Sequence, residues 1–386
     1  MGKIDVIYLY ALIIPIFAGL FTSLLGKYIN HMRTTKLHVK RKKDFRPLVS
    51  VIIPTWNEEK VIENTIRMVE KSYYDNFEII VIDDNSTDNT YKIVEKLTRE
   101  FSNIKLLRKK GMKGKAQSIN EAMEVAKGDL ILFLDADARI PPEYIPTHVS
   151  CFSRDDIEMI VTGFEPYNFK PKDFSHIIQE IYFTFVKDVV YSNIFVKMIF
   201  MGNGVFFRRK TLEKVLPIDP TTLVDDFSIA TELLKLGVKE YFSIYPWVEM
   251  QYATGLRELW KQHFRWYYGG FDEMMKRAKK GFGTFKAIYT FAFLFFFSPV
   301  ILTALSLIFK TYLFLVILEA IIIYIHSTFM FSTLLDTERK VSILNAIVLP
   351  PFIMLFELSV MMPAIFLPLI GFRRKVEWYK VERDEA

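Results

Sequence analysis

The sequence has almost no cysteine and lacks the glycine-rich loops that commonly bind phosphate. Its single cysteine, Cys151, cannot form an internal disulfide, which excludes a disulfide-stapled scaffold. No G-x-G-x-x-G follows the first predicted strand, and the segment from Gly111 to Ala116 lacks the spacing and the Ser or Thr of a P-loop. If the chain handles a phosphate group, it therefore has to do so by other means.

The composition combines two kinds of protein in one chain. Of its 386 residues 51% are hydrophobic, including 35 Phe, yet 24% are charged. One uniform domain rarely has both properties, so we expect a soluble part joined to a membrane part.

Long apolar stretches occur at both ends of the chain, and a helix needs about 20 apolar residues to cross the hydrocarbon core. The first could also be a secretory signal peptide, but it lacks a small-residue cleavage site, which favours a retained anchor. The four stretches are Val6 to Gly26, Ala287 to Phe309, Thr311 to Leu335 and Val341 to Phe372. Within them Glu319, His326 and Glu357 are costly in lipid, so they should face protein or a wet cavity.

Basic residues predict how the chain is oriented. Between Lys27 and Arg46 there are eight Lys or Arg and a single acid, Asp44. Because positive loops stay on the cytoplasmic side, the middle of the chain should be cytoplasmic, in a multi-pass cell-membrane protein. The basic segment 373–375 does not fit four full crossings. The proline-containing stretch before it is either a bent hairpin or an interfacial segment plus one crossing.

The chain therefore divides into a soluble domain between membrane parts. The predicted parts are a transmembrane helix at 1–27, a basic linker at 28–46, a catalytic domain at 47–253, an amphipathic interface helix at 254–283, a membrane region of about three helices at 284–372 and a polar tail at 373–386.

Strand and helix signals alternate in the middle domain. Buried strands are predicted where β-branched apolar runs occur, and helices where apolar residues recur at helical spacing. Such alternation predicts an α/β fold with a mixed, mostly parallel sheet and helices on both faces. The strands are predicted at Leu48–Pro54, Ile79–Asp83, Ile104–Leu107 and Leu130–Leu134, and the helices at Glu59–Lys71, Thr87–Phe101 and Lys115–Ala126.

Polar clusters follow three of these strands, at 55–58, 83–86 and 135–137. Ligands bind beyond the carboxyl ends of parallel strands, so these clusters predict a site at one edge of the sheet. Any one cluster alone could be a solvated turn or a helix cap. Asp135 and Asp137, one residue apart after a strand, can face one hard cation. Mg²⁺ or Mn²⁺ held by carboxylates and substrate phosphates would neutralise a diphosphate leaving group.

Taken together, the ordered motifs resemble the inverting family-2 glycosyltransferases with a GT-A fold. The closer resemblance is to the membrane-bound branch that contains cellulose, chitin and hyaluronan synthases and ceramide glucosyltransferase. It covers roughly residues 48 to 270. The motifs are Pro54-Thr55-Trp56-Asn57-Glu58-Glu59, Val81 to Asp88, Gly114-Lys115, Asp135-Ala136-Asp137, Asp225-Asp226 and Gln262-x-x-Arg265-Trp266.

This resemblance implies a nucleotide-sugar site, with a UDP-sugar favoured as donor. Asp83 and Asp84 would read the base, Asp84 more directly, and Lys115 would face the nucleotide sugar. Asp137 would be the more direct metal ligand, with Asp135 beside it. The implied donor-site residues are Pro54, Thr55, Asn57, Glu58, Asp83, Asp84, Lys115, Asp135, Ala136 and Asp137. Lys115 alone could also be a solvated helix start.

The second half of the domain would hold the catalytic base and the acceptor. Inverting transfer needs a base that deprotonates the acceptor hydroxyl. The resemblance makes Asp226 that base and Asp225 its neighbour, where two N-terminal helix acids are the plainer alternative. It also makes Gly202, Asn203 and Gly204 acceptor residues, although a tight turn would have the same glycines. The family often has Thr where this chain has Val224.

The segment Gly255 to Lys280 predicts an amphipathic, basic and aromatic helix suited to a membrane interface. On a helix Gln262, Arg265 and Trp266 share one face. Arg265 could hold diphosphate with its fork of donors, and Trp266 could stack on the acceptor sugar. A plain aromatic-belt helix is the alternative.

The sequence leaves the acceptor open. We expect an enzyme that extends a polysaccharide on the cytoplasmic face. A transferase that adds one sugar to a membrane lipid shares the same motifs, and an inactive subunit or glycan channel is the alternative outside enzymology. Expected partners are the nucleotide sugar, the glycan or lipid acceptor and membrane lipids, but no nucleic acid. The sequence does not decide whether the chain forms a homo-oligomer.

Overall fold

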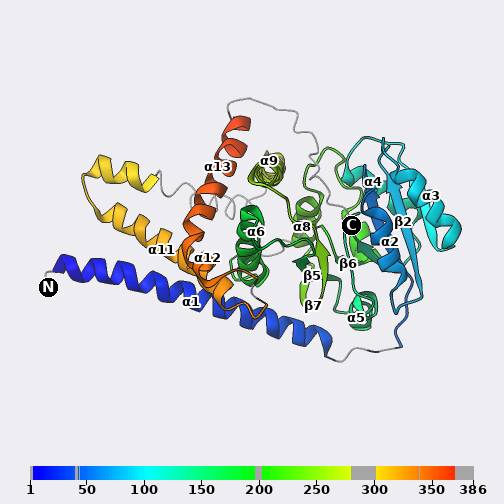
Figure 1. Ribbon diagram of the computed structural model, residues 1–386, viewed down its shortest axis with the longest axis horizontal. Helices are drawn as coiled ribbons and strands as arrows, with labels where there is room; N and C mark the ends of the chain where they lie inside the picture. The colour runs from blue at the N-terminus through cyan, green and yellow to red at the C-terminus, as the bar shows by residue number, and fades with distance from the viewer. Residues whose placement is uncertain are drawn as a thin grey trace. The chain divides into compact units, whose positions relative to one another are not determined.

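The computed structural model describes residues 3–39, 42, 44–195, 202–279, 301–338 and 340–369. Its chain forms two compact units (Figure 1). The helical unit comprises Met1–Ile29, Lys170–Val196 and Thr254–Val376, and the sheet unit comprises Asn30–Phe169, Lys197–Ala253 and Glu377–Ala386. Each unit is described by itself below.

The sheet unit is built on one seven-stranded sheet, in the order β3-β2-β1-β4-β6-β5-β7. Strands β1 to β4 run parallel, β6 is antiparallel to both neighbours, and β7 is parallel to β5. The mixed, mostly parallel sheet expected from the sequence is therefore present. The strands are β1 Val49–Thr55, β2 Phe77–Asp83, β3 Ile104–Arg108, β4 Leu130–Phe133, β5 Met159–Pro166, β6 Val205–Arg208 and β7 Glu240–Met250.

Helices cover the parallel half of this sheet. α2 connects β1 to β2 and α3 connects β2 to β3, so both crossovers move across the sheet in the same direction, and the two helices contact each other. α4 connects β3 to β4, which crosses the sheet in the opposite direction, and it contacts β1 and β2. Because such crossovers are right-handed, α2 and α3 lie on one face and α4 on the other. The helices of this unit are α2 Ile62–Glu70, α3 Thr90–Glu100, α4 Lys115–Val125, α5 Tyr144–Cys151, α7 Arg209–Leu212, η2 Glu213–Val215 and α8 Asp225–Lys235.

The core of the sheet unit explains why these segments are strands. β2 is buried at every position and β1 at all but one, as expected for strands covered on both faces. Their β-branched side chains suit a pleated, packed surface. These strands fix the sheet edge at which their carboxyl ends emerge.

The first helix, α1 (Lys3–His38), is longer than the predicted span. Its residues from Asn30 on belong to the sheet unit and bond to the edge strand β7. Arg33 donates to the Glu240 carbonyl at 3.0 Å, and the Ile244 N–H donates to the Thr34 hydroxyl at 3.1 Å. The first part of the predicted basic linker is therefore helical, because β7 supplies polar partners for it.

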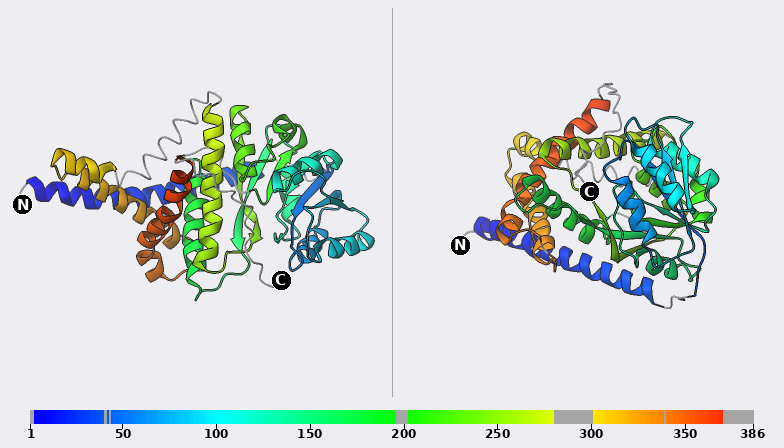
Figure 2. Two further views of the ribbon diagram at one scale, coloured as in Figure 1. Left: turned by 90° about the horizontal axis from the view of Figure 1, so that it is seen from above. Right: turned by 45° about the vertical axis from the view of Figure 1, so that its right-hand side comes forward.

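The helical unit contains the remaining helices (Figure 2). α9 packs against α13 and α6, and α6 packs against α11. The segment 170–196 belongs here, although the sequence placed it in the catalytic domain, because its apolar helix α6 finds its packing partners in this unit. The elements are the first part of α1, α6 Phe174–Phe185, the π-helix η1 Val186–Val190, α9 Leu256–Lys279, α11 Leu313–Leu334, α12 Ile343–Val348 and α13 Pro350–Leu369.

Three helices of the described residues are long and apolar enough to cross a membrane: Tyr8–His38, Leu313–Leu334 and Pro350–Leu367. The last predicted stretch is divided before Pro350 into a short helix, α12, and one candidate span, α13. The predicted span from Ala287 has only its end, 301–309, within the described residues, where it is helical, and the predicted tail at 373–386 lies outside them.

Candidate active site

The carboxyl ends of β1, β2 and β4 lie next to one another in the sheet, since the strand order is β2-β1-β4. The three predicted polar clusters follow these strands directly. The sequence expectation of one polar edge is thus met by the topology of the sheet unit.

The loops after β1 and β2 are bonded to each other. The Asp84 N–H donates to the Thr55 carbonyl at 2.8 Å, and the Asn57 amide oxygen accepts from the Thr87 N–H at 2.7 Å. Asn57 has a φ of 55°, a left-handed conformation that asparagine tolerates better than most residues. Glu58 is buried, and its N–H donates to the Thr90 hydroxyl at 2.7 Å. These contacts hold the predicted donor-site loops together as one surface.

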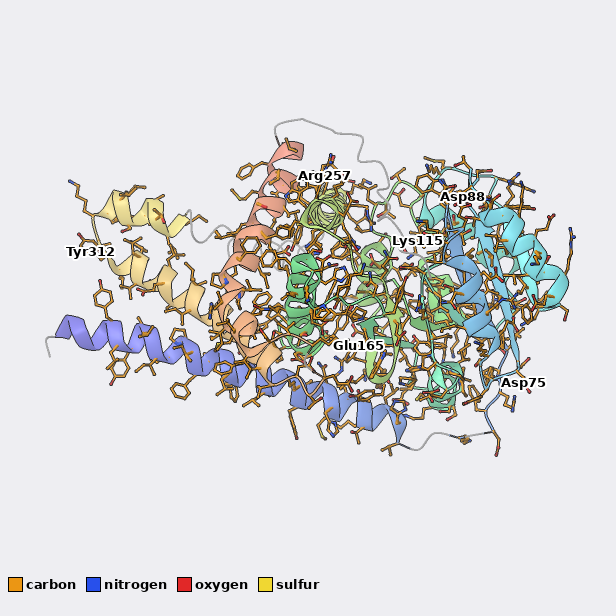
Figure 3. The ribbon with its side chains drawn as sticks, viewed as in Figure 1. Asp75, Asp88, Lys115, Glu165, Arg257 and Tyr312 are labelled. Carbon is orange, nitrogen blue, oxygen red and sulfur yellow. The ribbon has the colours of Figure 1, made fainter. Side chains whose placement is uncertain are left out.

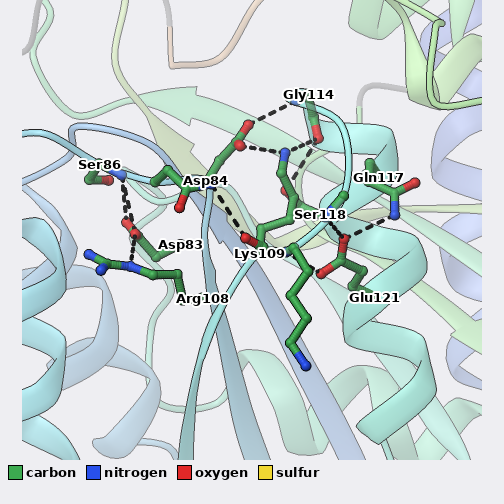
Figure 4. A network of polar contacts seen from close by, with 12 residues as sticks. Asp83, Asp84, Ser86, Arg108, Lys109, Gly114, Gln117, Ser118 and Glu121 are labelled. Atoms are coloured by element: carbon green, nitrogen blue, oxygen red, sulfur yellow. Dashed lines mark hydrogen bonds and ion pairs between the residues drawn. The ribbon is translucent and has the colours of Figure 1, made fainter.

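Asp84 is the centre of a buried polar network (Figure 4). Its carboxylate accepts from the Lys109 ammonium at 2.5 Å and from the Gly114 N–H at 2.8 Å. Lys109 also donates to the Gly114 carbonyl at 3.1 Å. Burial lowers the pKa of Lys109, and the Asp84 carboxylate opposes that shift. The network fixes Gly114, whose φ of 131° favours glycine, directly before Lys115.

Asp83 is completely buried and accepts from the Ser86 N–H at 3.2 Å. The Arg108 guanidinium lies 3.8 Å from its carboxylate. Both acids expected to read a base thus have contacts within the protein, and these contacts shape the loop that would surround the base.

The Asp135-Ala136-Asp137 loop is fixed from two sides. The Asp135 N–H donates to the Asn203 amide oxygen at 3.0 Å, and the Ala136 carbonyl accepts from the Thr65 hydroxyl at 2.7 Å. The Asp135 side chain is 38% exposed, whereas Asp137 is buried. The loop therefore presents one accessible carboxylate close to one covered carboxylate.

Lys115 joins the two acidic motifs of the sheet unit. It begins α4 (Figure 3), and its ammonium lies 2.7 Å from an Asp135 oxygen and 3.8 Å from an Asp225 oxygen. Burial disfavours the ammonium, but the charges of Asp135 and Asp225 outweigh burial and raise the pKa of Lys115. Lys115 therefore stays positively charged between the two motifs.

Asp226 lies against the predicted glycine segment. The Gly202 N–H donates to its carboxylate at 3.1 Å. A β-carbon added to Gly202 would lie 3.3 Å from both the Asp226 β-carbon and the Lys115 ammonium, and 3.5 Å from an Asp225 oxygen. The structure thus brings Lys115, Asp225, Asp226 and Gly202 to one point.

Asn203 and Gly204 bond to the backbone at the end of β4. Asn203 is buried and bonds the Asp135 backbone, while the Gly204 N–H donates to the Phe133 carbonyl at 2.9 Å. Gly204 has a φ of 73°, and an added β-carbon would lie 2.6 Å from the Tyr144 hydroxyl. Both residues therefore join β6 to the aspartate loop at the end of β4.

The acids of the site fit a divalent cation that takes further ligands from substrate. Within the described ranges no group of three or more His, Cys, Asp or Glu is placed to hold a metal. Asp135 and Asp137 supply two carboxylates, and Mg²⁺ is commonly held by one or two carboxylates together with phosphates and water. The donor set therefore suits Mg²⁺ or Mn²⁺ bound together with a diphosphate.

Gln262, Arg265 and Trp266 belong to the helical unit, on α9. The Gln262 amide oxygen is buried, with no hydrogen-bond partner in the described part of the chain. Trp266 stacks on His263, with ring centroids 4.7 Å apart and an interplanar angle of 26°. The helix predicted for Gly255 to Lys280 is present over Leu256–Lys279, and Lys280 lies outside the described residues.

Sequence reasoning missed Lys109, the buried partner of Asp84. It occurs in the basic run Arg108-Lys109-Lys110, which has the pattern of a solvated strand end. The available signal was its place at the carboxyl end of a strand paired with the aspartate-bearing strand β2.

The sheet unit has a GT-A fold. Over 95% of this chain and all of that chain, the structure is similar to a mannosyltransferase from Pyrobaculum calidifontis in complex with GDP-Man and Mn²⁺, with a TM-score of 0.59 and 19% identity. This similarity shows the GT-A fold.

Residues 50–216 match the family described as Glycosyl transferase family 2, so the chain carries a family-2 glycosyltransferase domain. The resemblance that the motifs indicated and the enzyme class, a glycosyltransferase, are thereby confirmed.

The curated relatives that match the chain include a glycolipid synthase and a polysaccharide synthase. A beta-monoglucosyldiacylglycerol synthase from Nostoc sp. is 27% identical over an alignment of 240 residues that covers 59% of this chain and 50% of the relative. A poly-beta-1,6-N-acetyl-D-glucosamine synthase from Staphylococcus aureus is 24% identical over an alignment of 277 residues that covers 69% of this chain and 66% of the relative. This chain spans about half the length of the glucosyldiacylglycerol synthases it matches.

Proposed function

We propose that this glycosyltransferase moves a sugar from a nucleotide-diphospho-sugar to a growing polysaccharide, with inversion at the anomeric carbon. The observation that carries the proposal is the convergence of Lys115, Asp135, Asp225 and Asp226 at the sheet edge. This cluster places a proposed metal ligand, Asp135, in one charged network with a proposed base, Asp226, and metal-assisted inverting transfer would use both.

The donor would bind along the loops after β1, β2 and β4. Thr55, Asn57 and Glu58 would border the nucleotide, and Asp83 and Asp84 would shape the base pocket through their fixed loop. Asp135 and Asp137 would hold Mg²⁺ or Mn²⁺, which supplies Lewis-acid neutralisation of the diphosphate. Lys115, which stays charged beside Asp135, would add a second positive charge on the donor side.

Asp226 is proposed as the base. The acceptor oxygen forms a bond to the anomeric carbon as Asp226 takes its proton, and the bond from that carbon to the diphosphate oxygen breaks. The nucleoside diphosphate leaves with the electron pair. The Gly202 N–H, at 3.1 Å from the Asp226 carboxylate, fixes the direction of the base. One displacement of this kind inverts the anomeric centre.

Gln262, Arg265 and Trp266 are proposed to serve the acceptor and diphosphate. A guanidinium presents a planar fork of donors that matches phosphate oxygens. An indole face suits stacking on a sugar ring. The half-buried side chains of Arg265 and Trp266 leave part of each available for such contacts.

The three apolar helices are proposed to anchor the enzyme in the cell membrane with the sheet unit on the cytoplasmic side. The basic segment between Lys27 and Arg46 supports this orientation, because such segments stay on the cytoplasmic side. Nucleotide sugars made in the cytoplasm would then reach the site directly.

A glycolipid product is the second candidate, and a specific observation favours it. The glucosyldiacylglycerol synthase relative is named for a lipid acceptor, whereas the poly-N-acetylglucosamine synthase relative is named for a polymer. Both relatives match more than half of this chain, so the product has to decide between the two candidates.

Product size tests the proposal. Membranes containing the full chain are incubated with labelled UDP- and GDP-sugars, Mn²⁺ or Mg²⁺, and the products are resolved by size and by extraction into organic solvent. We expect a ladder of water-soluble products with one UDP-sugar. A single labelled lipid product would contradict the polysaccharide proposal and support the glycolipid candidate. Absence of any donor turnover would contradict both.

A further inference from the structure

A buried polar cluster lies inside the helical unit. The Glu357 carboxylate, on α13, lies 2.9 Å from His263 Nδ1 and accepts from the Tyr267 hydroxyl at 2.6 Å. His263 is 1% exposed and Glu357 is 7% exposed. The Tyr182 ring, from α6, lies 5.1 Å from the His263 ring. Side chains from α6, α9 and α13 thus form one cluster that contains Glu357.

The cluster gives each Glu357 oxygen its own donor. Burial, followed by the charge of Glu357, raises the pKa of Tyr267 well above its ordinary value, so that the phenol keeps its proton and donates. A carboxylate in an apolar helix costs free energy unless it is bonded in this way. Removing it would leave the buried His263 and the half-buried Tyr267 of α9 without the acceptor that Glu357 provides, and an unpaired buried polar group costs more than an average hydrogen bond is worth.

Glu357 acts on the motif itself. His263 lies inside Gln262–Trp266, and Tyr267 follows directly after it, four residues from His263 on the same face of α9. The His263 ring supports Trp266, with centroids 4.7 Å apart. One face of Trp266 is therefore covered by the His263 ring.

We propose that Glu357 is a positioning residue for the Gln262–Trp266 motif. By bonding His263 and Tyr267 it sets the rotation of α9 and fixes Trp266 against the His263 ring. This inference rests on the proposed function, in which the motif binds diphosphate and acceptor. Glu357, a buried acid on a candidate membrane helix, would thus affect the reaction without contacting the substrate.

The test uses Glu357→Ala and His263→Asn, singly and together, in the full chain. Sugar transfer should fall by about tenfold or more in each single variant, as expected when a positioned group shifts. The double variant should be no slower than the slower single one, because both changes break the same contact. Glu357→Gln, which keeps one acceptor oxygen, should be intermediate.

The matched control is Glu319→Ala, since Glu319 is an exposed acid on the candidate membrane helix α11. It should change transfer by less than about twofold. Effects of Glu357→Ala and His263→Asn that multiply in the double variant, or a Glu357→Ala rate like that of the control, would overturn the proposal. Should Glu357→Ala fail to fold, Tyr267→Phe removes one donor only and should give a smaller loss of transfer.

A second readout separates this inference from the proposed function. Hydrogen–deuterium exchange of the 262–266 amides should be faster in Glu357→Ala and unchanged in Glu319→Ala. If the wild-type chain turned over no donor, the proposed function would fail, yet this exchange would still test the positioning. Equal exchange in Glu357→Ala and wild type would overturn it.

Discussion

At the scale of single residues, the account depends on charges that face one another in the sheet unit. Lys115 lies between Asp135 and Asp225, and Gly202 leaves room for Asp226 beside it. A neutral side chain of the same shape could not take the place of the charged residues, because each contributes a charge to the site. Gly202 contributes the space that these charges occupy.

Replacing Lys115 should disable the site. Lys115→Met removes the ammonium that lies 2.7 Å from Asp135 and leaves the carboxylates without their counter-charge. Transfer should fall by about a hundredfold, measured as initial rate with saturating donor. Lys110→Met is the control, because Lys110 is an exposed lysine of the same domain. A Lys115→Met rate within about threefold of wild type would contradict this role.

Gly202→Ala should slow transfer while the fold persists. Its added β-carbon would lie 3.3 Å from the Asp226 β-carbon and the Lys115 ammonium, so one of them has to shift by a few tenths of an ångström. We expect a loss of roughly tenfold or more in transfer, because reacting groups tolerate little displacement. Gly270→Ala, in α9, should be neutral, because an added β-carbon there would meet no other described residue within 4 Å. Equal rates for the two variants would contradict the tight fit.

At the scale of elements, close contact between helices depends on small residues. A β-carbon added to Gly19 on α1 would lie 2.1 Å from the Ser327 hydroxyl and 2.8 Å from the Thr328 nitrogen on α11. The Ser23 hydroxyl donates to the Thr328 carbonyl at 3.1 Å nearby. Small residues let membrane helices approach closely enough for such hydrogen bonds.

Gly19→Leu should therefore separate α1 from α11. Overpacking of this kind typically costs about 1 to 3 kcal/mol, and the thermal unfolding midpoint in detergent should fall by roughly 2 °C or more. The control is Phe17→Leu, because Phe17 is 65% exposed on the same helix. A midpoint for Gly19→Leu as high as that of the control would argue against this packing.

Several elements of the sheet could be predicted from the sequence. The runs at Leu48–Pro54 and Ile79–Asp83 are rich in β-branched apolar residues, so they predict the buried strands β1 and β2, and the acids that follow them mark the site edge. Strands β5, β6 and β7 were not predicted. Their pairing joins segments distant in sequence, and the reversal of β6 has no local signal.

Contacts between distant residues account for the other omissions. Lys109 has the sequence surroundings of a solvated lysine, and only the pairing of β3 with β2 buries it on Asp84. Glu357 was expected to face protein, but its partners His263 and Tyr267 could not be inferred, because they lie about ninety residues away. Individual motifs are visible in sequence, whereas the contacts between them depend on the fold.

At the scale of the whole molecule, stability should depend on pH through Asp188. Burial, which outweighs the opposing charge of Lys27, raises the pKa of this carboxyl to about 6. The native state therefore holds a proton that the unfolded state releases near its ordinary pKa of 3.8. Between these values the unfolded chain binds fewer protons, so stability falls as the pH rises.

The Asp188→Asn variant should lose this dependence. Wild type should lose on the order of 3 kcal/mol of unfolding free energy between about pH 4 and pH 6 relative to Asp188→Asn. Thermal unfolding across that range measures the difference. Asp155→Asn, at an exposed position, should follow wild type. Parallel pH profiles for wild type and Asp188→Asn would show that the carboxyl titrates normally.

The most direct test of the central claim is the transfer rate of Asp226→Asn. The amide keeps the shape of the side chain and its place beside Gly202 but cannot accept the acceptor's proton. The account predicts that transfer falls by about a thousandfold or more, while nucleotide binding, measured by calorimetry with Mn²⁺, stays near the wild-type value. Near-normal transfer by Asp226→Asn would contradict the account.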